Sequence, residues 1–298
     1  MIYRLWRLAR GLVTALPLPL VYAGADVVGL IAWLIMPVQR SNAVENMRRV
    51  VGARRARKVA CRSFQNYCRY VADFIRHTEL PAAHLLTRME WNDWSFVDGL
   101  LAGGRGCILV LMHFGNWDVG AGVLALRGYP FNAVAETQGD ERLDRDLVAA
   151  RTARGVKLIP MERAATGIVR AMRRNEFLAI LLDRPLDAGG VEVRFFGAPT
   201  RVPEGPARIA LRTGATVLPV GLARRRRNDD VVRPLFERPI VPERSGDDER
   251  DVIALTQTIM SAHERIIRRH PDQWYMFRRM WPAAPADSPS PAAAASPA

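Results

Sequence analysis

The stretch CILVLMHFGNWDVGAGVLALRG, residues 107–128, indicates the architecture of this chain. It begins with a short apolar run, 107–112, typical of a strand buried on both faces, and continues into a helical pattern closed by Gly128. Further apolar runs alternate with helical segments, at 131–136, 156–161 and 177–183. We therefore predict an α/β fold with a mainly parallel sheet covered by helices on both faces.

The composition is that of a basic globular protein of 298 residues. Its 43 Lys and Arg against 30 Asp and Glu give a net charge of +13, so the surface should attract anions: nucleic acid, lipid headgroups, or phosphorylated or carrier-bound substrates. Nucleic acid is the least expected of these, because no RNP block, zinc-finger spacing or phosphate-binding G-K-[ST] loop accompanies the arginines. Three cysteines without a C-x-x-C pair indicate neither a disulfide framework nor a zinc cluster.

Residues 1–38 form a hydrophobic segment that we expect to associate with a membrane. Within 11–36 the only charge is Asp26, and the apolar run continues past the one candidate signal-peptide cleavage site. Pro17 and Pro19 interrupt a spanning helix, and basic residues flank both ends, so the positive-inside rule selects no orientation. The segment could dip into the bilayer and return, lie in its interface, or pack as a helix pair on the protein's own core.

The rest of the chain divides into a body and a tail. We expect residues 39–282 to form the α/β domain, located at the cytoplasmic face of the inner membrane. Residues 283–298 are rich in Pro, Ala and Ser and have nothing to bury, so we expect them to be disordered.

The chemistry-bearing residues of the quoted stretch are His113 and Asp118. His113 directly follows a buried strand, and ligand crevices of open α/β sheets lie outside the carboxyl ends of such strands. After a tight turn, Asp118 begins the next helix and could fold back toward the imidazole. An aspartate bound to one ring nitrogen fixes the tautomer and makes the other nitrogen a better base. We predict that His113 is a general base oriented by Asp118.

No nucleophile accompanies this pair. The chain has no G-x-S-x-G elbow, and Cys107 lies at the far end of the strand. A base without a covalent partner suits direct transfer, in which His113 deprotonates an acceptor hydroxyl that attacks an activated acyl group. A satisfied polar histidine at the edge of a sheet remains the alternative interpretation.

Three blocks of the sequence resemble one family. HFGNWD, with its H-x-x-x-x-D frame, is similar to the signature of the lysophospholipid and lipid A acyltransferase superfamily. The region 181–220 and the block HPDQWYMFRRMWP, residues 270–282, resemble the branch that contains lipid A late acyltransferases and phosphatidylinositol mannoside acyltransferases. The aspartate at the last position of the frame and the form of the C-terminal block resemble the phosphatidylinositol mannoside acyltransferases more than the lipid A enzymes.

The resemblance implies a membrane-associated O-acyltransferase. It would move a fatty acyl chain from acyl carrier protein or coenzyme A onto a hydroxyl of a glycolipid or lysophospholipid, at an anionic membrane and without a metal or redox cofactor. His113 would be the base, Asp118 would assist it, and Glu192 would support it as the acidic residue that the branch carries near this place.

The same comparison suggests residues that contact substrate. Glu136 and Arg151 match polar positions that line the acceptor site in the mannoside branch, and Glu204 lies in a VPEGP block similar to a phosphate-handling block of glycerolipid acyltransferases. Arg184 follows a strand and is placed to meet a phosphate at the crevice rim. We add Asn116, from the turn between His113 and Asp118. Glu136, Arg151 and Arg184 could equally be surface charges, and Glu204 could be a residue of the first turn of a helix, where the helix dipole favours glutamate.

Two other classes of function stay open at this point. One is a basic membrane-surface or nucleic-acid-binding protein without catalysis, in which the arginine run 224–227 would contact the anionic partner. The other is a thioesterase in which the same histidine activates water instead of a hydroxyl.

Overall fold

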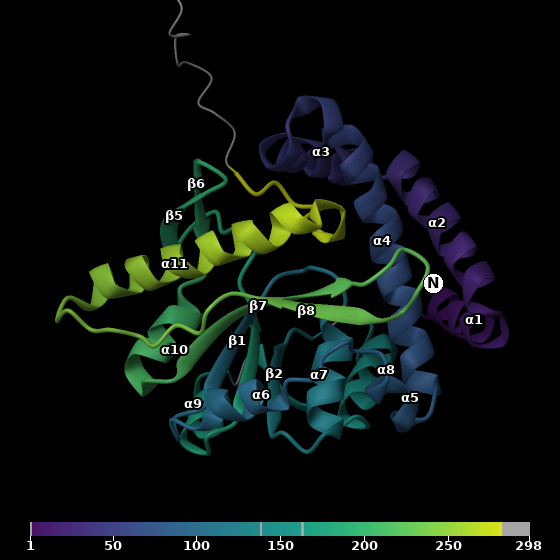
Figure 1. The fold of residues 1–298 in the computed structure, drawn as a ribbon. Coiled ribbons are helices and arrows are strands. Elements are labelled where there is room, and N and C mark those ends of the chain that lie inside the picture. The colour runs from purple at the N-terminus through teal and green to yellow at the C-terminus, as the bar shows by residue number, and fades with distance from the viewer. Residues whose placement is uncertain (1, 138, 162–163, 282–298) are drawn as a thin grey trace, which may run out of the picture.

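The computed structural model describes residues 2–137, 139–161 and 164–281. In the described part of the chain, six helices precede the first strand, and helices are interspersed with strands after it (Figure 1). The elements in chain order are α1 (Ile2–Ala15), α2 (Leu18–Ile35), α3 (Pro37–Val51), α4 (Ala53–Glu79), α5 (Ala82–Leu86), α6 (Trp94–Leu101), β1 (Cys107–Leu111), α7 (Trp117–Leu126), β2 (Phe131–Ala135), α8 (Glu141–Thr152), β3 (Lys157–Pro160), α9 (Ala164–Arg173), β4 (Phe177–Leu181), β5 (Val191–Phe195), β6 (Ala198–Val202), α10 (Gly205–Thr213), β7 (Thr216–Arg224), β8 (Val232–Phe236), α11 (Asp248–Arg269) and η2 (Pro271–Gln273). The expected tail, 283–298, lies outside the described residues.

The predicted α/β sheet is confirmed. Within the described residues, six strands pair in the order β3-β2-β4-β1-β7-β8, all parallel except the edge strand β8, and β5 and β6 form a separate antiparallel hairpin. The central strand β1 has β4 on one side and β7 on the other, and Leu111 lies opposite Leu181 in the β1–β4 register. The carboxyl ends of β1 and β4 therefore lie next to each other.

Both faces of the sheet are covered, because successive residues of β1 point to opposite sides. Ile108 and Val110 enter a large core shared with α9, α10 and α11, whereas Leu109 and Leu111 enter a second core shared with α6 and α7. All five residues of β1 are buried, as a parallel strand between two helical layers requires. In Figure 1, α11 crosses one side of the sheet, and α6 and α7 lie on the other.

The loop after β1 is held by backbone contacts on two sides. Gly115 has φ +62°, and its amide donates to the Gln273 carbonyl at 2.9 Å, while the next amide, that of Asn116, donates to the Leu222 carbonyl at 2.8 Å. A Cβ on Gly115 would lie 1.8 Å from that Leu222 oxygen. Glycine is required here both by the backbone conformation and by the approach of β7.

The N-terminal hydrophobic segment folds into α1 and α2. One side of α2 packs on α4 and buries Val21, Tyr22 and Trp33. The other side exposes large apolar residues, which continue along α1: Leu5, Leu8, Leu12, Leu20, Val27, Val28, Ile31, Leu34 and Ile35. Of the described helices, α2 is the one whose length and composition would allow it to cross a membrane, and about a fifth of it, 22 %, is buried against the protein.

Charges inside this apolar segment and in the arginine run are paired within the protein. Asp26 accepts from Arg69 of α4 and from Arg227, at 2.6 and 2.7 Å. Arg224 is 7 % exposed; it forms an ion pair with Asp73 and donates to the Tyr22 hydroxyl at 2.6 Å. The run 224–227 is therefore not wholly at the surface: its first residue is the last of β7 and ties α2 and α4 to the sheet.

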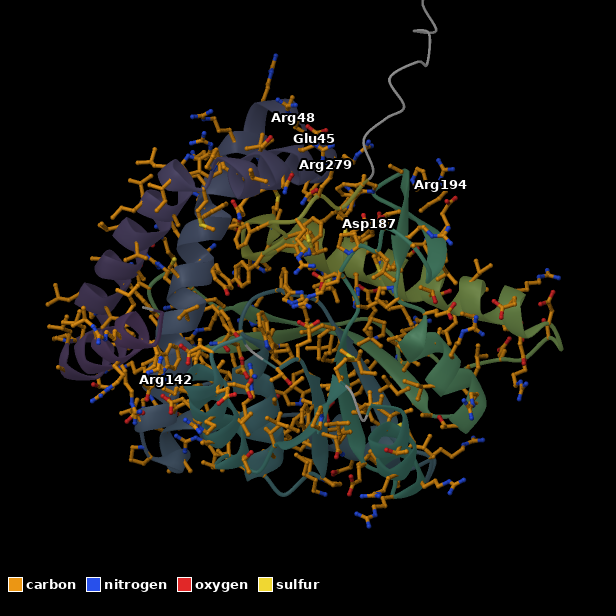
Figure 2. All side chains as sticks on the ribbon, turned by 180° about the vertical axis from the view of Figure 1, so that it is seen from behind. Glu45, Arg48, Arg142, Asp187, Arg194 and Arg279 are labelled. Carbon is orange, nitrogen blue, oxygen red and sulfur yellow. The ribbon has the colours of Figure 1, made fainter. Side chains whose placement is uncertain are left out.

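Basic residues outside the run 224–227 are distributed over the outer surface. Charged side chains on widely separated elements, including Arg48, Arg142 and Arg194, project away from the protein in Figure 2. Several of them are paired with neighbouring carboxylates, as Arg48 is with Glu45 at 3.0 Å. Exposed pairs of this kind add little to stability.

We expect Gly115→Ala to destabilise the fold by about 3 kcal/mol or more, since it adds a backbone clash to a strained φ. Gly128→Ala is the matched control, because Gly128 also has a positive φ, +91°, but nothing lies within 4 Å of its added Cβ. That variant should lose only about 1–2 kcal/mol. Denaturant unfolding measures both; equal losses would show that the contact with Leu222 is unimportant.

Candidate functional site

His113 is paired with a buried carboxylate. Its Nδ1 lies 2.8 Å from Oδ1 of Asp183, and its backbone N–H donates to Oδ2 at 3.0 Å. Each residue lies two positions past the paired Leu111 and Leu181, at the adjacent carboxyl ends of β1 and β4. Because Nδ1 faces a carboxylate, it carries the ring proton, and Nε2 is left as the basic nitrogen.

Asp183 is fully buried and receives one further donor. The indole Nε1 of Trp274 donates to Oδ2 at 2.9 Å. Burial alone would raise the pKa of Asp183, but the charge of His113 and the hydrogen bonds from His113 and Trp274 outweigh it and lower that pKa below its usual value. The carboxylate is therefore ionised at neutral pH and can stabilise a positive imidazolium.

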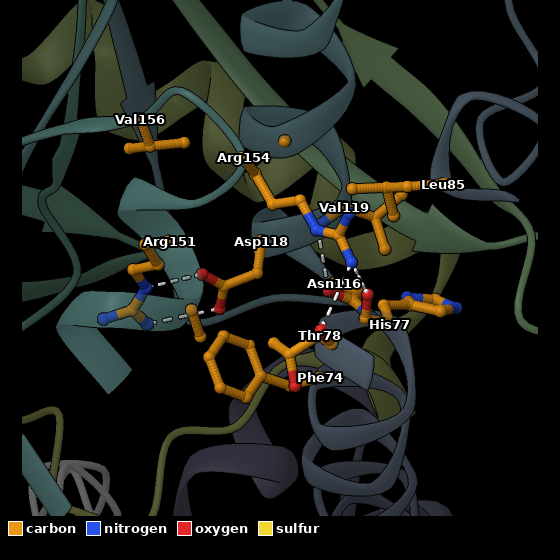
Figure 3. A pocket seen from close by; sticks show the side chains of 12 residues that line it. Phe74, His77, Thr78, Leu85, Asn116, Asp118, Val119, Arg151, Arg154 and Val156 are labelled. Carbon is orange, nitrogen blue, oxygen red and sulfur yellow. Dashed lines mark hydrogen bonds and ion pairs between the residues drawn. The ribbon is translucent and has the colours of Figure 1, made fainter. Parts of the chain in front are cut away.

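The expected hydrogen bond from the His113 ring to Asp118 is not what the structure shows, and this part of the prediction is corrected. Asp118 accepts from Arg151 Nε at 2.7 Å (Figure 3). It also accepts from the Tyr70 hydroxyl at 2.7 Å. It begins α7, and its carboxylate lies between α4 and α8. Its charge raises the pKa of Arg151 above the usual value, which keeps this ion pair formed. A catalytic role for Asp118 stays a prediction.

His113 opens onto a cavity of about 920 Å³. Most of its wall is apolar and comes from β1, β4, α6, α7 and β7, and a few polar groups interrupt it: His113, Asp118, Glu136, Arg151 and Arg184. The size lies at the upper end of the range for small-molecule sites, roughly 300–1,000 Å³. The side chain of His113 keeps 21 % of its surface exposed, so the ring is accessible from this space.

Part of the cavity runs along the sheet from His113 toward the amino ends of β1 and β4. Leu111 and Leu181 line it at the carboxyl ends of these strands. The small side chains of Ala133 and Ala179 follow, and Phe177 lies at the amino end of β4. From Asp183 to Phe177 is six residues, about 20 Å at 3.3 Å per residue. Half of a bilayer's hydrocarbon core is about 15 Å thick, so this depth suits a membrane-lipid acyl chain.

Three of the predicted substrate contacts line the cavity. Arg184 forms an ion pair with Glu136, and Arg151 holds Asp118 at another part of the wall. Asn116 does not line it. Its Oδ1 caps α7 by accepting from the Val119 amide at 3.2 Å, and its buried Nδ2 has no hydrogen bond within the described residues.

The structure does not bring Glu192 and Glu204 to the site. Glu192 alternates with the inward-facing Val191 and Val193 on the β5–β6 hairpin, so its side chain is exposed. Glu204 forms an ion pair with Arg208 one turn along α10, at 2.6 Å. The expected support of His113 by Glu192 is therefore corrected: Asp183, nine residues earlier, is the acid at the imidazole.

A second histidine cluster lies away from the cavity wall. His77 and His84 meet Asp230 of the β7–β8 connection, and the ligand-type atoms of the three residues lie within 4.8 Å of one another. Burial alone would raise the pKa of Asp230, but hydrogen bonds from His77 and Arg88 outweigh it and lower that pKa. A divalent cation there would lie beside the Arg88 guanidinium, and we interpret the cluster as an ion-pair network that joins α4 to this connection.

Sequence reasoning missed Asp183, Tyr70 and Trp274. The apolar run 177–183 ends in Asp183, and that was a usable signal, because carboxyl ends of parallel strands share one edge of the sheet. Which strands are neighbours is a property of the sheet order β4-β1, which spacing along the chain does not contain.

Asp183→Asn should lower the free energy of unfolding by about 3 kcal/mol at neutral pH. The folded-state pKa of Asp183 is lowered, so the stabilisation is present above the unfolded value of about 3.9 and is lost as pH falls through the folded value. The difference from wild type should thus stay constant from about pH 5 to 8 and shrink below about pH 4 in denaturant titrations. Asp187→Asn, at an exposed aspartate, is the control and should show no such difference; a gap of the same size at pH 3 and pH 7 would contradict the assignment.

Comparison with known proteins identifies the family of the chain. A family model described as bacterial lipid A biosynthesis acyltransferase matches residues 5–282. A phosphatidylinositol mannoside acyltransferase of Mycobacterium tuberculosis is 31 % identical over 247 residues, covering 80 % of this chain and 75 % of the relative. The protein of the same description from Mycolicibacterium smegmatis is 32 % identical over 224 residues, covering 74 % of this chain and 71 % of the relative. The chain therefore belongs to the bacterial lipid A biosynthesis acyltransferase family and is an acyltransferase of lipid biosynthesis.

Proposed function

We propose that this protein transfers a fatty acyl chain from a thioester of acyl carrier protein or coenzyme A to a hydroxyl of a glycolipid or lysophospholipid in the membrane. The observation that carries the proposal is the His113–Asp183 pair opening onto a deep apolar cavity. A mannoside-type acceptor is favoured over lipid A, because the relatives that are 31–32 % identical are named for phosphatidylinositol mannoside.

In the proposed reaction His113 is the general base. Its Nε2 takes the proton of the acceptor hydroxyl as the oxygen attacks the thioester carbonyl, and the imidazolium is stabilised by Asp183 through Nδ1–H. The new ester C–O bond forms, the C–S bond breaks, and the departing thiolate receives the proton from His113. The protein supplies the proton acceptor itself, so the proposal includes no metal or redox cofactor.

Asp118 has a different proposed role from that of Asp183. It fixes Arg151 at the cavity wall, where a guanidinium can meet a phosphate of the acceptor or of the donor. Arg184 offers a second guanidinium, and a bound phosphate would compete with Glu136 for it.

The apolar N-terminal helices support entry of the acceptor from a lipid surface. Trp6 of α1 lines the cavity, and its indole donates to Asp146 of α8 at 3.2 Å. Through Trp6, the helix α1, which also carries the exposed Leu5, Leu8 and Leu12, reaches the space that leads to His113. We propose that these helices lie in the interface of the inner membrane on its cytoplasmic side, with α2 joined to the body through Asp26 and Tyr22.

A thioesterase is the second candidate, since water could replace the acceptor hydroxyl at the same base. The apolar surface beside the cavity favours a lipid acceptor instead. With a purified acyl thioester and a mannosylated phosphatidylinositol in vesicles, a transferase forms acylated lipid, whereas a hydrolase forms free acid at the same rate with or without acceptor.

In that assay His113→Ala and Asp183→Asn should each slow transfer roughly 10²–10⁴-fold, because they remove the base or its orienting carboxylate. Asp118→Asn should cost less, since one oxygen remains to accept from Arg151. Circular dichroism checks that all three variants fold. Undiminished transfer by His113→Ala would overturn the mechanism, and a larger loss in Asp118→Asn than in Asp183→Asn would reassign the orienting acid.

Ala179→Phe should block the part of the cavity toward the amino end of β4, because Ala179 lines the wall between Leu181 and Phe177. We expect transfer of long acyl chains to be lost while short chains are still transferred, measured over a series of donors of increasing length. The short-chain rate is the internal control for intact chemistry. Equal loss at all lengths would place the acyl chain elsewhere.

A further inference from the structure

The C-terminal block that follows α11 pairs with the loop that carries His113. The amide of Tyr275 donates to the His113 carbonyl at 2.7 Å, and Phe114 and Trp274 form an antiparallel bridge. Together with the Gly115 amide, which donates to Gln273, these contacts hold the backbone on both sides of His113. Residues 273–275 thus lie directly against the candidate base.

Within this block, the side chain of Trp274 reaches the partner of the base. It is fully buried, and its indole N–H donates to Asp183 Oδ2 at 2.9 Å. The ring packs edge-on against Phe195, with centroids 5.8 Å apart, and beside Phe196 at 6.2 Å. The hairpin β5–β6 therefore fixes the direction of the indole N–H.

We propose that Trp274 is a positioning residue of the acyl transfer: its indole N–H orients the Asp183 carboxylate and limits how strongly that carboxylate holds the proton of His113. The inference rests on the proposed function, in which His113 is the base. Trp274 itself touches neither substrate nor the reacting atoms.

The chemistry follows from how Asp183 shares its charge. The carboxylate accepts three hydrogen bonds, two from His113 and one from Trp274. Each donor draws negative charge away from the oxygens and makes the ionised carboxylate less basic. Without the indole N–H, Asp183 would bind the imidazolium more tightly. His113 would then stay protonated to a higher pH, and the acidic limb of the rate profile would move upward.

Other ionisable groups around the pair are already paired or neutral. Burial lowers the pKa of His263 on α11 to about 4, so this histidine is neutral at neutral pH; its Nε2 lies 3.1 Å from the Val110 carbonyl. The remaining groups packed near the site are the Asp118–Arg151 pair with Tyr70, the Arg184–Glu136 pair, and Tyr275, a phenol whose pKa is raised by burial. Within the described residues, the side-chain donors to Asp183 are those of His113 and Trp274.

The test compares Trp274→Phe with Trp281→Phe. Each substitution keeps an aromatic ring and removes one indole hydrogen bond from the same aromatic cluster, but the Trp281 bond goes to the Phe195 carbonyl, at 3.0 Å, and not to Asp183. Initial transfer rates are measured over pH 5–9. We expect the acidic limb of Trp274→Phe to move up by about one pH unit, and its rate at high pH to fall less than its rate at pH 6. Trp281→Phe should keep the wild-type limb.

A second measurement separates this inference from the proposed function. The titration of the His113 ring is followed by NMR of ¹⁵N-histidine-labelled protein, with the signal assigned by its loss in His113→Gln. The midpoint should rise in Trp274→Phe whether or not the assay finds transfer. An unchanged midpoint and an unchanged limb, with a rate loss equal to that of Trp281→Phe, would overturn the positioning role and leave Trp274 as a core residue. A raised midpoint in Trp274→Phe, together with no acyl transfer by the wild-type protein, would instead overturn the proposed function alone.

Discussion

The hydrogen bond between Nδ1 of His113 and the buried carboxylate of Asp183 constrains much of the structure around it. A charge taken fully out of water is tolerated only when it is paired and hydrogen-bonded. The partners of Asp183 come from the end of β1 and from the C-terminal segment, so these parts must converge beside the end of β4. Gly115 permits the convergence, since any side chain there would meet the backbone of β7.

The N-terminal helices are joined to this framework by polar contacts and not by apolar packing alone. Asp26 and Tyr22, both on α2, are held by arginines of α4 and of the β7 region, and α4 also supplies the Tyr70 hydroxyl to Asp118. The exposed apolar surface of α1 and α2 thus has a defined position relative to the cavity. A charge that looks costly in a membrane segment, Asp26, is explained by its partners within the protein.

Under the proposed function, the cavity and its few polar groups would together bind the acyl chain and carry out its transfer. The apolar wall provides burial for a hydrocarbon chain, worth about 0.8 kcal/mol per CH₂ group, while His113 lies where the chain would end in a reactive carbonyl. Arg151 and Arg184 hold positive charge at the same wall, each beside a carboxylate that can be exchanged for or shared with a phosphate. Binding and chemistry are therefore arranged along one continuous space.

Local pattern was sufficient for much of the protein. Apolar runs and helix periodicity predicted the parallel sheet, its helical layers and the position of His113 at a strand end, because these depend on neighbours along the chain. The identity of the acid was decided only by tertiary structure. Spacing favoured Asp118, five residues away, but the order of strands places Asp183, seventy residues away, against the ring, and turns Asp118 toward Arg151. The same holds for Trp274 and for the partners of Asp26 and Arg224, since contacts between distant segments depend on how strands and helices are ordered in space, which no local periodicity records.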